Sequence, residues 1–468
     1  MTLVAGVDSS TQSVKIVVCD ADTGEVVRTA RASHPPGTEV SATAWLTAWQ
    51  QATADPDLLD GVAALSVGGQ QHGMVTMDDQ GELVRDALLW NDNRSAPDAL
   101  DLIAELGGGQ AWADAVGSVP VASMTVAKIR WLARAEPENA ARTAAVALPH
   151  DWLMWQIAGR SFPLTTDRGD ASGTCYFDAT ANQYRQDLVR LAIGHELELP
   201  RVAGPAEIVG YTPNGIAVAP GTGDNMAGGL GLGVTAGDAI VSLGTSGTAF
   251  TTSAEQTHEP TGTVAGFADA TGAFLPLVCT LNGARNLVAT AEVLGVSLSE
   301  LSRLALSAEP GSQGVTFLPY LEGERTPPLP DARGQLLGLT LPNLTPANLA
   351  RATIEGVLWS LAYGVEVLRQ QVGEISSITL TGGASQSDAV RQIASAVFGL
   401  PIVVTDTFES VAVGAARQAA WALTGTLPEW PVPVLSRHDP TEADLRAAEE
   451  ISERYRAYLT AHFGSPHA

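Results

Sequence analysis

The chain has 468 residues, more than a single hydrophobic core usually supports, so two domains of ordinary size are expected. Hydrophobic residues make up 45% and charged residues 16%, which is typical of a globular protein and excludes a disordered one. The formal net charge of −25, from 51 acidic and 26 basic residues, repels nucleic acid and anionic membranes, so neither is an expected partner.

The cysteines and the first residues indicate a cytoplasmic protein. Cys19, Cys175 and Cys279 are odd in number and far apart, which argues against a disulfide framework and fits a reducing compartment. The apolar run that begins the chain is interrupted at Asp8 and has no basic region before it, so it predicts a first strand and not a signal peptide. The most apolar later stretch, residues 226–243, contains Asp238 and many glycines and does not read as a membrane span.

Two hairpins of one design are predicted. Residues 3–7 and 14–19 are valine-rich runs separated by DSSTQS, and residues 239–243 and 249–252 flank GTSGT in the same manner. A small, hydroxyl-rich hairpin tip is, taken alone, more often an ordinary turn. The recurrence of the design more than about two hundred residues later suggests two halves built on one plan.

Strand and helix signals alternate in the rest of the chain. Residues 63–67 and 378–380 read as strands, and the later one is followed by GGAS. Three segments have apolar residues at helical spacing, namely 350–372, 388–398 and 412–423. A Pro-rich stretch near Pro431 is expected to lead to a terminal helix. The chain is therefore predicted to be α/β, with buried sheets and covering helices.

Several common catalytic motifs are absent from the sequence. It has no Gly-x-x-x-x-Gly-Lys-Ser/Thr loop, and Lys15 and Lys128 are its only lysines, which excludes a P-loop mechanism. It also lacks an HExxH motif, a Cys/His cluster and a Gly-x-Ser-x-Gly elbow, so zinc hydrolysis and the usual serine hydrolase layout have no support.

The two hairpin tips are candidate phosphate sites. Asp8 ends the first strand and precedes five hydroxyl or amide residues, and consecutive backbone N–H groups at such a turn can bind phosphate oxygens. A carboxylate at a strand end can hold Mg²⁺ through water. Residues 244–248 offer an opposing cradle in which glycines allow a close approach of the backbone. The structural alternative at Asp8 is an Asx-turn that only closes a hairpin.

The segment TLTGGASQSD is a candidate nucleotide surface. Gly382 and Gly383 leave a flat surface without side chains, next to the start of a helix. The alternative is a plain strand-to-helix turn in which Ser385 is the N-cap.

Asp224, in GTGDNMAGG, is the candidate general base. Glycines precede it and a helix rich in Ala and Gly is predicted to follow. A position at a helix start favours the ionised carboxylate, which is the state that accepts a proton from a hydroxyl, and in a loose phosphoryl-transfer transition state a base of low pKa is sufficient. The alternative, and the commoner use of such a residue, is an N-cap.

Three polar clusters could bind a polyol, because sugar recognition needs fixed donors and acceptors. A single histidine or tryptophan is more often structural, so the grouping carries the prediction. The clusters are Gln70, Gln71 and His72; Trp90, Asn91, Asp92 and Arg94; and Asp167 with Asp170.

These segments together resemble the FGGY family of carbohydrate kinases, and within it the branch that acts on xylulose. The resemblance runs from Val4 to about Leu423, and its pieces are in family order: GVDSSTQSVK, GGQQHGM, LLWNDNR, LPHDWL, TTDRGDASGT, GTGDNMAGG, SLGTSGT, FLPYLEGERTP and TGGASQS. It implies an actin-like ATPase (ribonuclease H-like) fold, with two domains of similar core around a catalytic cleft. One departure is that Ser10 stands where the first hairpin of the family has glycine, which restricts the loop and adds a hydroxyl.

The resemblance also implies roles for residues. Asp224 would be the base, and Asp8 would assist with phosphate and hold Mg²⁺ through water. The sugar would contact Gln71, His72, Asn91, Asp92, Arg94, Asp170, Asp224 and Asn225. ATP would contact Thr11, Gln12, Ser13, Lys15, Gly244, Thr245, Ser246, Gly247, Gly382, Gly383, Ala384, Ser385 and Gln386.

The expected activity is ATP- and Mg²⁺-dependent phosphorylation of D-xylulose to D-xylulose 5-phosphate. Residues 1–233 would form the N-terminal domain with the sugar site, the first phosphate hairpin and the base, and residues 234–468 the C-terminal domain with the second hairpin, the adenosine site and a terminal helix. A homodimer is one assembly that the resemblance allows. Two alternatives stay open: a kinase of the same family for ribulose, ribitol, gluconate or glycerol, and an actin-like nucleotide switch without sugar kinase activity.

Overall fold

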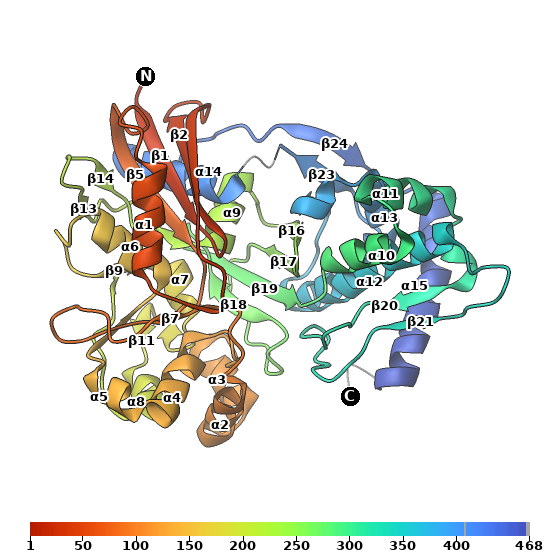
Figure 1. The fold of residues 1–468 in the computed structure, drawn as a ribbon, viewed down its shortest axis with the longest axis horizontal. Coiled ribbons are helices and arrows are strands. Elements are labelled where there is room, and N and C mark those ends of the chain that lie inside the picture. The colour runs from red at the N-terminus through yellow and green to blue at the C-terminus, as the bar shows by residue number, and fades with distance from the viewer. Residues whose placement is uncertain (407–408, 465–468) are drawn as a thin grey trace. The chain divides into compact units, whose positions relative to one another are not determined.

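The computed structural model describes residues 1–406 and 409–464 as an α/β fold (Figure 1). The chain forms two units. Unit 1 consists of Met1–Gly233, Ser253–Leu275 and residues 409–432, and unit 2 consists of Val234–Thr252 and residues 276–406 and 433–464. Each unit therefore contains segments that are far apart in the sequence.

Unit 1 is built on a mixed sheet in the order β13-β14-β5-β1-β2-β3, with β15 also paired to β5. Strands β1 to β3 are antiparallel neighbours, whereas β5 runs parallel to β1, and β14 and β15 run parallel to β5. The bounds of the sheet strands are β1 Leu3–Ser9, β2 Ser13–Asp20, β3 Val26–Ser33, β5 Val62–Gly69, β13 Gly210–Tyr211, β14 Ala217–Val218 and β15 Thr222–Gly223.

Alternating side chains of these strands build two hydrophobic layers, because successive residues of a strand point to opposite faces of the sheet. On one face, Val7 and Ile16 belong to the same core as Trp45 of helix α1 (Thr43–Ala52). On the other face, Val4 and Val17 pack with the alanines of helix α14 (Ser410–Thr424). Figure 1 shows α1 and α14 with the sheet of unit 1.

Unit 1 contains further helices and short strands outside this sheet. Its remaining helices are α2 Ala96–Leu106, α3 Gly109–Val116, α4 Thr125–Ala135, α5 Pro137–Arg142, α6 Pro149–Ile157, α7 Arg168–Ser172, α8 Gln186–Ile193 and α9 Asp224–Leu232. Its short strands are β4 Glu39–Val40, β6 Val75–Met77, β7 Ala87–Leu88, β8 Ala145–Ala147, β9 Thr165–Asp167, β10 Phe177–Asp178, β11 Gln183–Tyr184, β12 Arg201–Ala203 and β18 Ala265–Ala268.

Unit 2 has a sheet of the same design, with strands in the order β19-β17-β16-β22-β23-β24. Here β16, β17 and β19 are antiparallel neighbours, and β22 runs parallel to both β16 and β23. The bounds are β16 Asp238–Leu243, β17 Gly247–Thr251, β19 Phe274–Thr280, β22 Ser377–Thr381, β23 Ile402–Thr405 and β24 Val434–His438, and a separate pair is formed by β20 Thr316–Leu318 and β21 Gln335–Leu337.

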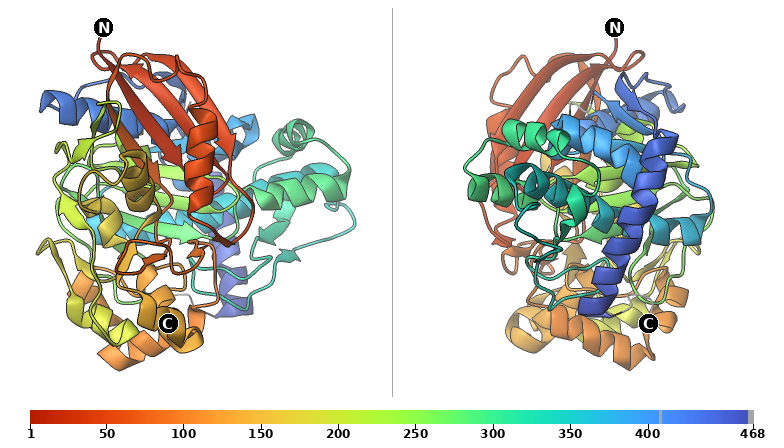
Figure 2. Two further views of the ribbon diagram at one scale, coloured as in Figure 1. Left: turned by 60° about the vertical axis from the view of Figure 1, so that its left-hand side comes forward. Right: turned by 90° about the vertical axis from the view of Figure 1, so that its right-hand side faces the viewer.

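Long helices accompany this second sheet. Helix α12 packs against β17 and α13, and α15 packs against α13 and α12 (Figure 2, right). The helices of unit 2 are α10 Arg285–Leu294, α11 Leu298–Ser307, α12 Pro346–Val372, α13 Asp388–Phe398 and α15 Glu442–Phe463, with 3₁₀ turns at Ser312–Gly314 and Gly383–Gln386.

The structure confirms the predicted α/β class with two cores of similar build. In each unit, three antiparallel strands form one side of the sheet. The strand on the other side of the first of them runs parallel to it, as β5 does next to β1 and β22 next to β16. Both predicted hairpins are present, as β1–β2 and β16–β17, and the predicted helices appear as α12, α13, α14 and α15. Within residues 1–406 and 409–464, no helix is long and apolar enough to cross a membrane.

Candidate active site

In unit 1, Asp8, Gln71 and Asp224 lie where three parallel strands end. Ser9 at the end of β1 and Gly223 at the end of β15 both pair with Gly69, the last residue of β5. Asp8 therefore lies on one side of the β5 end and Asp224 follows directly on the other side. Gln70 continues from β5, and its N–H donates to the Ser9 carbonyl at 3.2 Å. Because the carboxyl ends of parallel strands are where α/β sheets bind ligands, the topology supports a binding site here.

Asp8 is buried, at 2% exposed, and it is bound by side chains. Lys15, its partner across the β1–β2 hairpin, places Nζ 3.3 Å from Asp8 Oδ2 and 2.7 Å from Glu409 Oε2. Ser10 Oγ donates to Asp8 Oδ1. Burial raises the pKa of Asp8, while Lys15 and Ser10 oppose that rise. The Asx-turn alternative does not describe this carboxylate, because its described partners are the Ser10 hydroxyl and the Lys15 ammonium group.

The first hairpin tip is held by a tryptophan. Trp90 Nε1 donates to Thr11 Oγ1 at 2.8 Å, which connects the tip to the segment of the second polar cluster. Gln12 is exposed, and its carbonyl accepts from the N–H of His34 at 2.9 Å. Ser13 is buried at the start of β2. Thr11 and Gln12 are thus the more accessible members of the predicted phosphate-binding residues in this loop.

Asp224 is the first residue of α9, and Gly223 is the N-cap, so the N-cap alternative for Asp224 is wrong. Its Oδ1 accepts from the backbone N–H of Asn225 at 2.9 Å. The pKa of Asp224 is raised to about 7, first by burial and then by the charges of Asp8 and Asp170. The prediction that the helix start holds this carboxyl ionised with a low pKa is therefore wrong. The hydrogen bonds that Asn225 donates from its backbone N–H and from Nδ2, together with the helix dipole, are outweighed by desolvation and two neighbouring carboxylates.

Gln71 contacts the neighbour of the candidate base, and His72 follows Gln71 in the chain. Gln71 Oε1 accepts from Asn225 Nδ2 at 2.8 Å, whereas Gln71 Nε2 is buried without a hydrogen-bond partner among the described residues. His72 has a left-handed backbone conformation with φ of 67°, its Nδ1 lies 2.7 Å from the Gly173 carbonyl, and its ring packs against Phe267. A non-glycine residue is held in this conformation only by its surroundings, which is common at binding sites.

The second polar cluster is largely occupied by its own contacts. Asp92 Oδ1 accepts from Arg94 Nε at 2.9 Å, and Asp92 Oδ2 accepts from Thr38 Oγ1 at 2.8 Å. Arg94 is also 2.7 Å from Glu39 Oε2. Asn91 Oδ1, in contrast, is buried and has no hydrogen-bond partner among the described residues. Of the three predicted sugar contacts in this segment, Asn91 has the free hydrogen-bonding capacity.

The third cluster is fully buried. Asp167 is the N-cap of α7, and its side chain accepts from the N–H groups of Gly169 and Asp170 and from Thr222 Oγ1. Asp170 Oδ2 lies 2.7 Å from Nδ1 of His150, a residue that is not among the predicted site residues. Asp170 Oδ1 has no hydrogen-bond partner in the described part of the chain. The only sequence signal for His150 was its place in LPHDWL, one of the family pieces.

In unit 2, the second hairpin and the glycine turn are adjacent, because Ser242 of β16 pairs with Thr381 of β22 in parallel. Gly382 has φ of +85°, and a Cβ there would lie 2.7 Å from the Leu243 carbonyl carbon, so the turn requires glycine. Next to it, Gly383 is exposed, and a Cβ there would meet no atom within 4 Å. The predicted surface without side chains is thus present at Gly383, beside the tip at residues 244–246.

The rest of the glycine turn differs in part from expectation. Ser385 is buried and its hydroxyl donates to the Gly382 carbonyl at 2.7 Å. Ser387, not Ser385, is the N-cap of α13, with its side chain accepting from the N–H of Val390, so the N-cap alternative for Ser385 is wrong. A 3₁₀ turn over Gly383–Gln386 separates the strand from the helix and moves the cap two residues onward. Gln386 is exposed and Ala384 is partly exposed.

Glu324, which is not among the predicted site residues, supports the second hairpin. It accepts from the N–H of Leu281 at 2.6 Å and from Asn282 Nδ2 at 2.9 Å, and so fixes the segment after β19. That segment holds the hairpin tip, since Gly283 N–H donates to the Thr245 carbonyl and Ala284 N–H to the Gly244 carbonyl. The buried carboxylate of Glu324, in FLPYLEGERTP, thus fixes the loop after β19, and this loop in turn fixes the hairpin tip.

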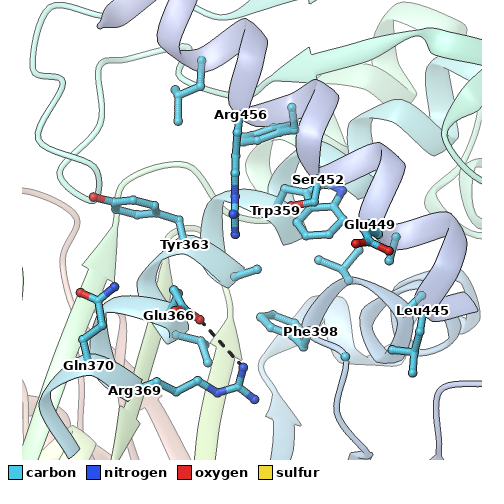
Figure 3. Close-up of a pocket in the computed structure, with 18 of the residues that line it drawn as sticks. Trp359, Tyr363, Glu366, Arg369, Gln370, Phe398, Leu445, Glu449, Ser452 and Arg456 are labelled. Atoms are coloured by element: carbon cyan, nitrogen blue, oxygen red, sulfur yellow. Dashed lines mark ion pairs between the residues drawn. The ribbon is translucent and has the colours of Figure 1, made fainter. Parts of the chain in front are cut away.

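A cavity of about 600 Å³ lies in unit 2 between α12, α13 and α15 (Figure 3). Aromatic side chains such as Trp359 and Phe398 line it together with Arg456, and Glu366 lies 4.0 Å from Arg369 at its edge. None of the predicted sugar or ATP residues line this cavity. The strand ends, and not this cavity, carry the residues that the sequence predicts.

Among the described residues, no three His, Cys, Asp or Glu side chains are grouped as a protein-only metal site. A divalent ion at Asp8 would therefore need most of its ligands from water and from a bound phosphate. This fits Mg²⁺, which keeps several waters and is usually held by one or two carboxylates plus phosphate oxygens.

Two units with the same strand order, each with a hairpin tip beside parallel strand ends, define the chain as an actin-like α/β ATPase fold. Comparison with known protein families gives the same result and identifies the family. Residues 3–231 match the N-terminal domain and residues 239–423 the C-terminal domain of the FGGY family of carbohydrate kinases. The chain belongs to this family, as its motifs predicted.

The chain is similar to curated and structurally solved members. It is 45% identical over 438 residues to the xylulose kinase of Streptomyces coelicolor, which covers 90% of this chain and 88% of that one. It is 43% identical over 465 residues to the xylulose kinase of Streptomyces rubiginosus, covering 96% and 94%. The crystal structure of xylulose kinase from Bifidobacterium adolescentis matches with a TM-score of 0.87 and 45% identity, covering 96% of this chain and 99% of that one.

Proposed function

We propose that the protein phosphorylates D-xylulose with ATP, forming D-xylulose 5-phosphate and ADP. The observation that carries the proposal is 45% identity to a xylulose kinase over 90% of the chain. The site agrees with it, because buried polar atoms of Gln71, Asn91 and Asp170 have no protein hydrogen-bond partner in the described residues. Unsatisfied buried polar groups are unfavourable, and the hydroxyls of a ketose would satisfy them.

The proposed chemistry assigns the proton to Asp224. The sugar 5-hydroxyl attacks the γ-phosphorus, the bond from that phosphorus to the bridging oxygen of ADP breaks, and the hydroxyl proton passes to the Asp224 carboxylate. A carboxyl with a pKa of about 7 is half ionised near neutral pH and is a stronger base than an ordinary aspartate. Asn225 and Gln71, which are hydrogen-bonded to each other, hold the sugar end of the site next to this base.

The nucleotide roles are proposed for the loops at the strand ends. The tips at Thr11–Gln12 and Gly244–Gly247 bind the phosphates through backbone N–H groups, and Gly382, Gly383, Ala384 and Gln386 bind the adenosine, with Ser385 shaping their turn. Lys15 opposes the rise that burial causes in the pKa of Asp8 and so favours its charged form. Mg²⁺ bound at Asp8 through water would neutralise phosphate charge. Residues 1–233 would thus supply sugar binding and the base, and residues 234–468 nucleotide binding.

The acceptor is the finer part of the proposal. The same family acts on several polyols, and ribulose, ribitol, gluconate and glycerol are the competing acceptors. An actin-like nucleotide switch is the alternative of another class, and it leaves the base and the unsatisfied polar groups of Gln71 and Asn91 without a use. We also propose a cytoplasmic location, where ATP is supplied. Native mass spectrometry would test whether the protein forms a homodimer.

Coupled ADP release with MgATP and these five acceptors tests the proposal, with Asp224→Asn as the matched variant. Asn has nearly the shape of Asp but does not accept the proton. We expect turnover with D-xylulose in the parent and a loss of about 10³-fold or more in the variant. Preferred turnover of another acceptor would refute D-xylulose alone. ATP hydrolysis that no acceptor stimulates would refute the kinase reaction.

A further inference from the structure

A histidine is buried behind the candidate base in unit 1. His150 is the second residue of α6 and is 0% exposed. Two glycines make room for its ring: a Cβ on Gly69 would lie 2.7 Å from His150 Cβ, and a Cβ on Gly221 would lie 2.5 Å from His150 Cδ2. Gly69 ends β5 and Gly221 directly precedes β15, the two strands that lead to Gln71 and Asp224, so the imidazole is buried next to the site.

Both ring nitrogens face carboxylates. Nδ1 lies 2.7 Å from Asp170 Oδ2, and Nε2 lies 3.2 Å from Asp151 Oδ1, the latter as an ion-pair contact without hydrogen-bond alignment. A neutral imidazole has one N–H, and its other nitrogen carries a lone pair that a carboxylate repels. Only the imidazolium has an N–H on each side. The geometry therefore favours the charged ring at this place.

The acidic surroundings lead to the same result. Asp151, Asp167 and Asp170 are all buried, and the positive charge of His150 opposes the burial that raises the pKa of each. The pKa of His150 itself is raised to about 9, since the attraction of these carboxylates exceeds the effect of its burial. The phenols of Tyr176 and Tyr184 also face the group, and burial and the same carboxylates raise their pKa values, which keeps both neutral.

The buried group formed by His150 and its neighbouring carboxylates is connected to the candidate base in two ways. The charge of Asp170 raises the pKa of Asp224. In addition, Asp167 Oδ2 accepts from Thr222 Oγ1 at 2.7 Å, and Thr222 is two residues before Asp224. A change at His150 would therefore reach the base through the charge of Asp170 and through the position of strand β15.

We propose that His150 is a positioning residue for phosphoryl transfer, which as a buried imidazolium keeps Asp170 ionised and oriented beside the base Asp224. The inference rests on the proposed function for the role of Asp224, but the charge of the ring does not depend on it. Loss of the positive charge leaves Asp170 in a buried site without its cation, so Asp170 takes up a proton and no longer makes Asp224 a stronger base.

The protonation state of the ring is tested first, because it needs no activity. Long-range ¹H–¹⁵N spectra of the full chain labelled with ¹⁵N-histidine, compared with those of His150→Gln, assign the His150 ring. We expect both of its nitrogens to carry protons from about pH 6 to about pH 8. A neutral tautomer over this range would overturn the proposal. The result holds whichever acceptor the enzyme uses, so it separates this proposal from the proposed function.

Kinetics then test whether the charge matters for the reaction. His150→Gln, which keeps a polar side chain without the charge, should lower kcat/KM for the sugar by about tenfold or more and change KM for ATP by less than about twofold. His150→Lys, which keeps the charge, should recover most of the loss. Equal losses in both variants would overturn the proposal, because a role in packing alone predicts that result.

The pH profile adds a readout that a structural role would not move. In His150→Gln the acid limb of kcat/KM should shift to lower pH by about half a unit or more, because Asp170 becomes neutral. Asp170→Asn removes the same charge directly and should shift the limb in the same direction. An unchanged limb in both variants, or a shift to higher pH in His150→Gln, would refute the coupling between His150 and the base.

Discussion

Replacing Asp224 by Asn is expected to make the protein more stable at neutral and alkaline pH while it abolishes turnover. Desolvation and the charges of Asp8 and Asp170 raise the pKa of Asp224 from 3.8 to about 7. A carboxyl whose pKa is raised on folding makes the folded state less stable once the pH exceeds the unfolded pKa, and this penalty is complete above the folded pKa. Asparagine has no such penalty.

The magnitude follows from the size of the shift. A rise from 3.8 to about 7 is about three pKa units, and each unit corresponds to about 1.4 kcal/mol, so the upper limit is about 4 kcal/mol. Asp224 is partly exposed, and solvent reduces the effect, so we expect about 1–2 kcal/mol at pH 8. Near pH 4, where the carboxyl is largely protonated in the folded state and half protonated in the unfolded state, the difference should be below about 0.6 kcal/mol.

Urea unfolding of the parent and of Asp224→Asn, without nucleotide, sugar or divalent ions, measures this difference at about pH 4 and pH 8. Asp79→Asn is the matched control, because Asp79 is an exposed aspartate of the same unit and should change stability little at either pH. An Asp224→Asn variant that is no more stable than the parent at pH 8 would refute the raised pKa. A gain of equal size at both pH values would show that ionisation is not the cause.

Further predictions concern sugar binding, the first hairpin and the glycine turn. His72→Ala should raise the KM for the sugar about tenfold or more and that for ATP less than about twofold, and an unchanged sugar KM in initial-rate assays would remove His72 from the site. Ser10→Gly removes the hydroxyl that donates to Asp8, so the half-saturating Mg²⁺ concentration should change by about threefold or more; an unchanged Mg²⁺ titration would contradict this. Gly382→Ala should lower stability by about 1–3 kcal/mol in thermal melts, whereas Gly383→Ala, with open space at its Cβ, should not; equal melting temperatures would refute the close packing.

Local sequence patterns were sufficient for the elements of the fold but not for every packing partner. The valine-rich runs predicted β1 and β2, and helical spacing predicted α14. The sequence did not say that α14 packs against the sheet of unit 1, although its alanines allow a close approach: a Cβ on Gly6 would lie 1.8 Å from the Ala412 carbonyl oxygen. Periodicity identifies the apolar face of a helix, whereas the sheet that covers this face depends on the path of the whole chain.

For the candidate site, too, local motifs predicted which residues take part but not what surrounds them. Motifs identified Asp8, Gln71 and Asp224, which the strand ends of unit 1 bring together. The low pKa expected for Asp224 was wrong because the helix dipole can be read from neighbouring residues, but burial and the charges of Asp8 and Asp170 come from distant segments. His150 was overlooked for a related reason. A histidine in a sequence does not reveal that two carboxylates will face its ring nitrogens.

The buried carboxyl groups of unit 1 lower the stability of the protein when no ligand is bound. Asp8, Asp170 and Asp224 each have a pKa raised by burial, and within the described residues Lys15 is shared between Asp8 and Glu409. Ionising these carboxyls together lowers the stability of the free protein, because like charges at low polarity repel. Any ligand that brings positive charge or hydrogen-bond donors to them stabilises the ionised forms and hence the fold. Binding is therefore expected to release protons and to raise the melting temperature, and the carboxylates that make the free protein less stable are the same ones that the proposed transfer needs.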